Sequence, residues 1–201
     1  MCIRDRNISQ FFLYLLATAF IQNAVLTTGF GTSIMLRVVR RPRDTFAFGG
    51  MLTVFSVLTT MIAYPIDRLI GTSATAKLWR PIIMIVIVAA LYIAAVLVLK
   101  KTLPFLYKNV SRLLPLAAFN NLVIGFALIA NHQFTLSFWG AVGLALGACI
   151  GFILLSWLTA EGMERIDNPD MPQSFRGLPA TLIYLGILAM ALLGFSSSIA
   201  L

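Results

Sequence analysis

Residues 81–99 read PIIMIVIVAALYIAAVLVL, an apolar run without a charged side chain. A helix of roughly 20 apolar residues crosses the ~30 Å hydrocarbon core of a bilayer. This run therefore predicts a transmembrane helix over Pro81–Leu99. Apolar runs of spanning or near-spanning length also occur at Ile8–Leu26, Phe46–Ile66, Leu113–Ala130, Leu136–Leu158 and Leu178–Ile199. We expect an all-α integral membrane protein with six transmembrane helices.

The composition agrees with a chain that lies mostly in lipid. Of the 201 residues, 60% are hydrophobic and only 11% are charged, whereas soluble domains are nearer half apolar and a quarter charged. The net charge of +8 comes from short basic clusters between apolar runs and not from one basic face. This pattern argues against nucleic-acid binding and makes the lipid bilayer the expected surrounding.

Basic residues in short loops predict the orientation, because such loops stay in the cytoplasm. The odd-numbered connections carry most of them: Arg37, Arg40, Arg41 and Arg43 in the first, Lys100, Lys101, Lys108 and Arg112 in the third, and Arg165 and Arg176 in the fifth. The second and fourth connections hold Arg68, Lys77 and Arg80. We therefore expect both termini to lie outside the cytoplasm.

The first six residues, MCIRDR at 1–6, are similar to a translated sequencing adapter, and we expect them to be foreign to the natural protein. The apolar run that follows lacks a small-residue cleavage site. It is therefore expected to be a first transmembrane helix and not a removable signal peptide.

Two polar, glycine-containing stretches interrupt the expected helices. Residues 22–33 read QNAVLTTGFGTS, and residues 119–126, FNNLVIGF, repeat the pattern of Asn, a branched apolar run and Gly-Phe. Non-helical backbone at membrane depth persists only against protein or a water-filled cavity. We therefore predict two inverted three-helix repeats, residues 7–107 and 108–201, with broken helices one and four meeting near the midplane.

The polar residues of these breaks are the candidate midplane site, and they are Asn23, Thr27, Thr28, Gly29, Gly31, Asn120, Asn121 and Gly125. The asparagines should face the bundle interior, because a lipid-facing amide is costly. Interhelical hydrogen bonding and an ion or redox site are both open interpretations. No Asp or Glu lies in the middle of an expected span, which disfavours a self-contained carboxylate pump.

Gly143, Gly147 and Gly151 recur at intervals of four on one expected helix. They remove side chains from one face, so that a neighbouring helix can approach closely. Helix packing and a ligand groove are the two interpretations. With only Cys2 and Cys149, the sequence offers no disulfide framework or CxxC metal site, and no hydrolase or nucleotide-binding motif occurs. We expect no catalytic residues and no metal ligands.

Several ordered motifs resemble one family. Residues 101–107 read KTLPFLY, Leu114-Pro115-Leu116 leads into Asn120, and Phe175-Arg176-Gly177 precedes Leu193-Gly194-Phe195-Ser196. In this order and spacing they look like the A subunit of Rnf complexes, whose counterpart is the E subunit of the sodium-pumping NADH:quinone reductase (Nqr). The resemblance runs from about Asn23 to the end of the chain.

The resemblance implies a multi-pass subunit of the bacterial inner membrane, paired with a homologous subunit of opposite topology and with flavin and iron-sulfur subunits. In that family the two paired subunits each supply two cysteines, one from each broken helix, and together they hold a membrane-embedded [2Fe-2S] cluster. Here the family's cysteine positions fall on Ser33 and Asn121. Neither side chain supplies the thiolate that such clusters select, so we expect no cluster bound by this chain alone.

The expected function is that of a membrane subunit of an Rnf/Nqr-type complex that couples electron transport to Na⁺ or H⁺ translocation. The chain would be a non-catalytic or electron-relay subunit, and a divergent one without its own cluster ligands. A stand-alone inverted-repeat transporter or channel is the alternative, with Asn23 and Asn120 among its site residues. A purely structural membrane subunit is a third interpretation.

Overall fold

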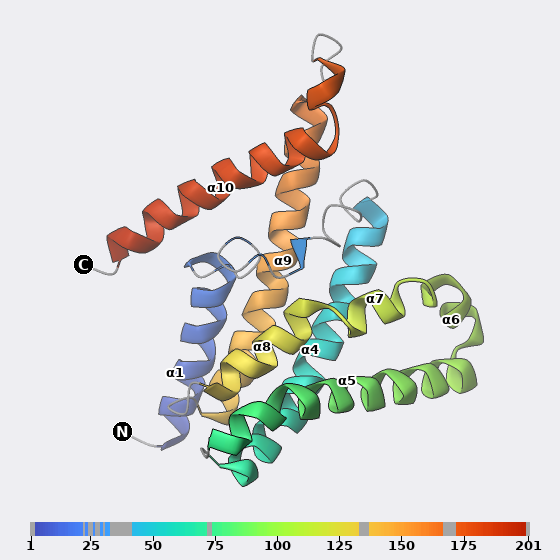
Figure 1. Cartoon of the computed structure of the whole chain (residues 1–201), viewed down its shortest axis with the longest axis vertical. Coiled ribbons are helices and arrows are strands. Elements are labelled where there is room, and N and C mark those ends of the chain that lie inside the picture. Colours follow the sequence, from blue (N-terminus) through green and yellow to red (C-terminus); the bar gives the residue numbers. More distant parts are fainter. Residues whose placement is uncertain are drawn as a thin grey trace.

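The computed structural model describes residues 3–21, 23, 26, 29, 31–32, 42–71, 74–132, 137–166 and 172–199. The regular elements of this part of the chain are all helical (Figure 1). They are α1 (Ile3–Leu16), the π-helix η1 (Ala17–Ile21), α4 (Pro42–Ile70), α5 (Ala74–Thr102), α6 (Pro104–Val110), α7 (Leu114–Ala118), α8 (Asn121–His132), α9 (Phe138–Ile166), the 3₁₀-helix η2 (Gln173–Phe175) and α10 (Leu178–Ile199).

Each expected span overlaps helix in the described residues. Three helical stretches are long and apolar enough to cross a membrane, namely Thr45–Ile70, Leu78–Thr102 and Phe138–Ile166. The other three expected spans coincide with shorter apolar helices at Ile8–Phe20, Leu114–Gly125 and Leu178–Gly194. The all-helical, membrane-compatible fold class is thereby confirmed for the described residues.

Several helices extend beyond the expected ends, and α4 and α5 show the reason. α4 continues past Ile66 to Ile70, with Pro65 inside the helix, and its buried Asp67 lies in the extension. α5 begins at Ala74, so Pro81 is an internal residue and not the helix start. Both extensions carry charged residues, which the apolar runs alone could not include.

The centre of the fold is α9, which packs between α1 and α4. In Figure 1, α4 and α9 run side by side, whereas α5 and the α7–α8 segment cross them. Helix α9 has 67% of its most apolar window buried. Because lipid tails are as apolar as Leu, close van der Waals packing and not hydrophobicity holds such helices together.

Glycines on α9 allow α1 to approach. A Cβ built on Gly143 would overlap the carbonyl oxygen of Phe11, and one built on Gly147 would overlap the carbonyl oxygen of Leu15 and Oγ1 of Thr18. The hydroxyl of Thr18 donates to the carbonyl of Tyr14 at 2.6 Å and lies 3.3 Å from the carbonyl of Leu144 on α9. The backbones of α1 and α9 are therefore in contact along this face.

The opposite side of α9 builds the main apolar core with α4 and α8. The rings of Phe48 and Phe152 lie 5.8 Å apart between centroids, and Leu52, Leu122 and Val123 are fully buried beside them. These contacts bring the start of α8, far along the chain, against the middle of α4.

One buried ion pair fixes the connection between α4 and α5. Nε of Arg80 lies 2.7 Å from Oδ1 of Asp67, with side chains only 8% and 4% exposed. Arg80 also donates to the carbonyl oxygen of Gly71 at 2.9 Å. An unpaired charge here would be strongly destabilising, so each residue requires the other.

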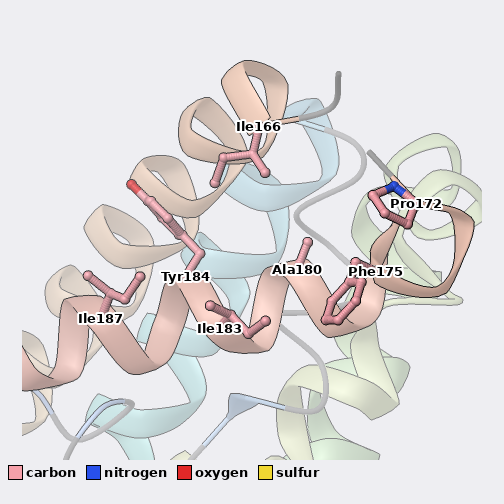
Figure 2. A pocket seen from close by; sticks show the side chains of 7 residues that line it. All are labelled: Ile166, Pro172, Phe175, Ala180, Ile183, Tyr184 and Ile187. Atoms are coloured by element: carbon pink, nitrogen blue, oxygen red, sulfur yellow. The ribbon is translucent and has the colours of Figure 1, made fainter. Parts of the chain in front are cut away.

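Helix α10 meets the bundle at the end of α9. An apolar crevice of about 200 Å³ lies between them, lined by Ile166, Pro172, Phe175, Ala180, Ile183, Tyr184 and Ile187 (Figure 2). The ring of Tyr184 occupies the space that a side chain at Gly162 would need. Beyond this contact α10 leads away from α9 (Figure 1), and Met190 and Leu193 are exposed.

Candidate functional site

The first helix loses its regular geometry before the first break. Residues Ala17–Ile21 form a π-helix turn, a feature that occurs often at functional sites. Asn23 follows it and is only 4% exposed. Its Nδ2 donates to the carbonyl oxygen of Ala19 at 3.4 Å, so the amide satisfies a carbonyl that the ending helix leaves free.

Glycines turn the backbone beyond Asn23. Gly29 and Gly31 have φ of +71° and +82°, a left-handed conformation that favours glycine. The hydroxyl of Thr32 donates to the carbonyl of Gly29 at 2.8 Å. The expected break in the first helix is therefore present at these residues. Thr27, Thr28 and Ser33 lie outside the described residues.

The second break separates α7 from α8 at Phe119 and Asn120. Oδ1 of Asn120 accepts a hydrogen bond from the backbone N–H of Leu122 at 2.9 Å, as in a side-chain N-cap. Asn120 is 1% exposed. Its Nδ2 has no hydrogen-bond partner among the residues that the structure describes.

The two breaks meet beside α9. A Cβ built on Gly31 would lie 3.2 Å from the ring of Phe152 and 3.6 Å from Oδ1 of Asn120. A larger residue at Gly31 would therefore press on the second break. Asn23 lies against Gly151, the residue next to Phe152 on α9. Residues of both breaks thus gather around one short segment of α9.

Two further members of the predicted site, Gly125 and Asn121, differ in burial. Gly125 is buried inside α8, whereas the side chain of Asn121 is exposed at its first turn. The expectation that Asn121 faces the bundle interior is therefore wrong within this chain. The reason is local: Asn120 occupies the buried capping position, so the next side chain in the helix points to another side.

Buried hydroxyls extend the polar character of the interior. Ser56 and Thr59 on α4, and Ser156 on α9, are fully buried. The hydroxyl of Ser56 lies beside the thiol of Cys149, whereas the hydroxyls of Thr59 and Ser156 have no hydrogen-bond partner in the described part of the chain. An unsatisfied buried polar group costs about 1–3 kcal/mol, so these positions favour water or another polar group. The sequence alone does not single them out, because isolated Ser and Thr residues are common in membrane helices.

Cys149 does not belong to the breaks. It is fully buried on α9, and its thiol lies beside the hydroxyls of Ser56 and Thr53 on α4. Across the described ranges, no three His, Cys, Asp or Glu side chains gather into a possible metal site. The groups near the breaks that could bind a cation are side-chain amides, hydroxyls and backbone carbonyls.

The family of the chain follows from its similarity to known proteins. Residues 11–199 match the family described as "Rnf-Nqr subunit, membrane protein". The chain belongs to the Rnf-Nqr family. It is an Rnf-type membrane subunit, and the resemblance found in the ordered motifs is thereby confirmed.

Similar Rnf-Nqr proteins cover nearly the whole chain. The A subunit of the Na⁺-translocating ferredoxin:NAD⁺ oxidoreductase complex of Acetobacterium woodii is 31% identical over 182 residues, which are 90% of this chain and 94% of that protein. The A subunit of the ion-translocating oxidoreductase complex of Pasteurella multocida is 32% identical over 191 residues, covering 94% and 97%. The corresponding protein of Syntrophotalea carbinolica is 30% identical, covering 92% and 95%.

The side chains at the expected ligand positions of this chain do not fit the [2Fe-2S] cluster that the Rnf-Nqr family implies. At one of the two expected ligand positions stands Asn121, a neutral amide whose side chain is exposed, and at the other stands Ser33. Iron-sulfur clusters are held by thiolates. Cys149, on another helix against α4, is not at either position.

Proposed function

We propose that this chain is a divergent subunit of an Rnf-type complex in which electron transport drives Na⁺ or H⁺ translocation. In this proposal it shapes the ion path and supplies no cluster ligand of its own. The observation that carries the proposal is the meeting of Gly31 with Asn120 beside Phe152. Two broken helices meet there inside a subunit whose expected ligand positions hold Ser33 and Asn121.

The inverted repeat of residues 7–107 and 108–201 is part of this proposal. The first helix of each half packs on the middle helix of the other half, α1 on α9 and α8 on α4, and the two middle helices pack together. A two-fold axis between the halves would produce this arrangement. The pair Asp67-Arg68 and the pair Glu164-Arg165 also recur at the spacing that separates Asn23 from Asn120.

The ion would meet neutral oxygen ligands. Unwound backbone carbonyls at paired helix breaks can coordinate a cation without a buried carboxylate. Asn23, Gly29, Gly31, Asn120 and Gly125 are the described residues of this candidate midplane site. Thr27 and Thr28, which lie outside the described residues, belong to the same proposal. The buried hydroxyls of Ser56, Thr59 and Ser156 extend polar surface along α4 and α9.

We further propose that a homologous subunit of opposite topology pairs with this chain in the bacterial inner membrane, together with flavin and iron-sulfur subunits. The names of the relatives support assembly, because each is a lettered subunit of a complex. Only 17% of the most apolar window of α5 is buried within the chain, which leaves that helix free to contact lipid or a partner. The basic connections favour termini outside the cytoplasm.

A stand-alone inverted-repeat transporter is the second candidate function. It is favoured by the neutral side chain of Asn121 at a family cluster position and by the buried hydroxyls of Thr59 and Ser156, which have no partner among the described residues. Ion flux into liposomes that hold the purified chain alone supports this candidate. A flux equal to that of empty liposomes rejects it.

The proposed assembly is tested by co-purification. A C-terminally tagged chain is extracted from its own membranes in mild detergent, and the proteins that accompany it are identified by mass spectrometry. We expect a second Rnf-Nqr protein together with flavin-containing subunits in fixed proportion. Recovery of the folded chain alone, in detergents of several kinds, rejects the proposal.

A further inference from the structure

The turn between α5 and α7 concentrates basic charge. Lys100, Lys101, Lys108 and Arg112 are all exposed there. The sequence contains no Asp or Glu between Asp67 and Glu161, so no acid close in sequence neutralises this charge. We refer to residues 100–112 as the basic turn.

The basic turn also presents apolar side chains. Leu103 is 53% exposed and Phe105 is 81% exposed, directly between the basic pairs in sequence. Helix α6 lies where the chain reverses from α5 to α7 (Figure 1). Nζ of Lys100 lies 5.3 Å from the ring centroid of Tyr107, a cation–π contact that joins the last turn of α5 to α6.

Two other exposed arginines have different surroundings. Arg165 pairs with Glu161 at 3.2 Å, and Arg68 donates to the hydroxyl of Tyr64 at 2.8 Å. The basic turn therefore differs in having several exposed cations with no acid close in sequence, at the end of the apolar window Leu78–Thr102. The end of a transmembrane helix is the depth at which lipid headgroups lie.

We propose that the basic turn binds anionic phospholipids, with the cations on the headgroup phosphates and Phe105 and Leu103 between the uppermost acyl carbons. Clusters of Lys and Arg next to a transmembrane helix attract anionic headgroups. Aromatic and aliphatic side chains beside such clusters insert at the boundary between headgroups and acyl chains. This combination of charge and exposed apolar surface fits a lipid surface better than an acidic protein, which would match the charge alone.

The proposal is tested by the lipids that the purified chain retains. The chain in detergent is mixed with equal amounts of phosphatidylglycerol and phosphatidylcholine that carry the same acyl chains, and native mass spectrometry counts each bound lipid. The test variant is Lys101→Gln/Arg112→Gln. The control, Arg165→Gln/Arg176→Gln, removes the same charge at another pair of exposed basic residues.

We expect the wild-type chain and the control to prefer phosphatidylglycerol, and the test variant to lose this preference by about fivefold for each charge removed. The variant Phe105→Ser should reduce retention of both lipids alike, because it removes apolar contact and no charge. Equal preferences in the test variant and the control overturn the proposal. The proposal is also overturned if the test variant keeps its lipid preference but, in the co-purification with the tagged chain, loses another protein. The basic turn would then bind protein.

Discussion

Asn23 and Gly151 fit together at the end of the first helix: a Cβ built on Gly151 would lie 2.8 Å from Nδ2 of Asn23 and 3.0 Å from the carbonyl oxygen of Ala19. The same face of α9 touches the backbone of α1 at Gly143 and Gly147. The position of the first break therefore depends on glycines on a helix of the second half of the chain.

Gly147→Ala should destabilise the chain, because the new methyl group would overlap the backbone carbonyl of Leu15, which cannot move without moving α1. Overpacking of this kind costs about 1–3 kcal/mol. The matched control is Gly186→Ala in α10, where nothing lies within 4 Å of the added atom. Thermal unfolding in detergent should show a lower midpoint for Gly147→Ala only, and equal midpoints for the two variants would contradict the packing described.

The two adjacent asparagines at the second break should respond differently to substitution. Asn120→Ala removes the acceptor of the Leu122 N–H, and the loss of such a cap costs about 0.5–2 kcal/mol. Asn121→Ala removes an exposed side chain and should change the free energy of unfolding by less than about 0.5 kcal/mol. Asn120→Ser, which keeps a capping oxygen, should recover part of the loss when the unfolding of all three variants is followed in detergent. A larger effect at Asn121 would show that a partner buries it or that the break is built differently.

The ion pair of Asp67 and Arg80 should be sensitive to removal of either member. Asp67→Asn leaves the buried guanidinium without its 2.7 Å partner, and breaking a buried pair typically costs about 3–5 kcal/mol. Arg68→Gln, next in sequence but exposed, is the control and should have an effect below about 1 kcal/mol. The double variant Asp67→Leu/Arg80→Met should unfold at a higher temperature than Asp67→Asn. If Asp67→Asn and Arg68→Gln unfold alike, the pair is not buried in the protein.

The helices could be predicted well from the sequence because apolar length is a local property. Each of the six expected spans overlaps helix in the described residues, and both breaks occur where Asn and Gly interrupt the apolar runs. The family could also be predicted, since motifs such as residues 101–107 keep their order along the chain. Helix ends such as Ile70 were harder to predict, because the burial of Asp67 in the last turns of α4 depends on its pairing with Arg80.

The candidate site was only partly predictable. Asn23 and Asn120 could be singled out because amides are rare in apolar runs, but their burial depends on the approach of α9. Which of Asn120 and Asn121 faces inward depends on the helix phase, and one residue changes it by about 100°, since a helix has 3.6 residues per turn. The hydroxyls of Ser56 and Ser156 could not be singled out, because their burial is a property of tertiary packing.

In our proposal this chain is part of an Rnf-type redox complex, and its own ligand positions hold no cluster. The most direct measurement is flavin, iron and acid-labile sulfide per purified complex, compared among wild type, Cys149→Ser and Ser33→Cys/Asn121→Cys. We predict bound flavin in all three, iron unaffected by Cys149→Ser, and the iron and sulfide of one further [2Fe-2S] cluster in the double cysteine variant, because a partner protein supplies the other two thiolates. A preparation without flavin or iron, or iron that is lost with Cys149, would contradict this account.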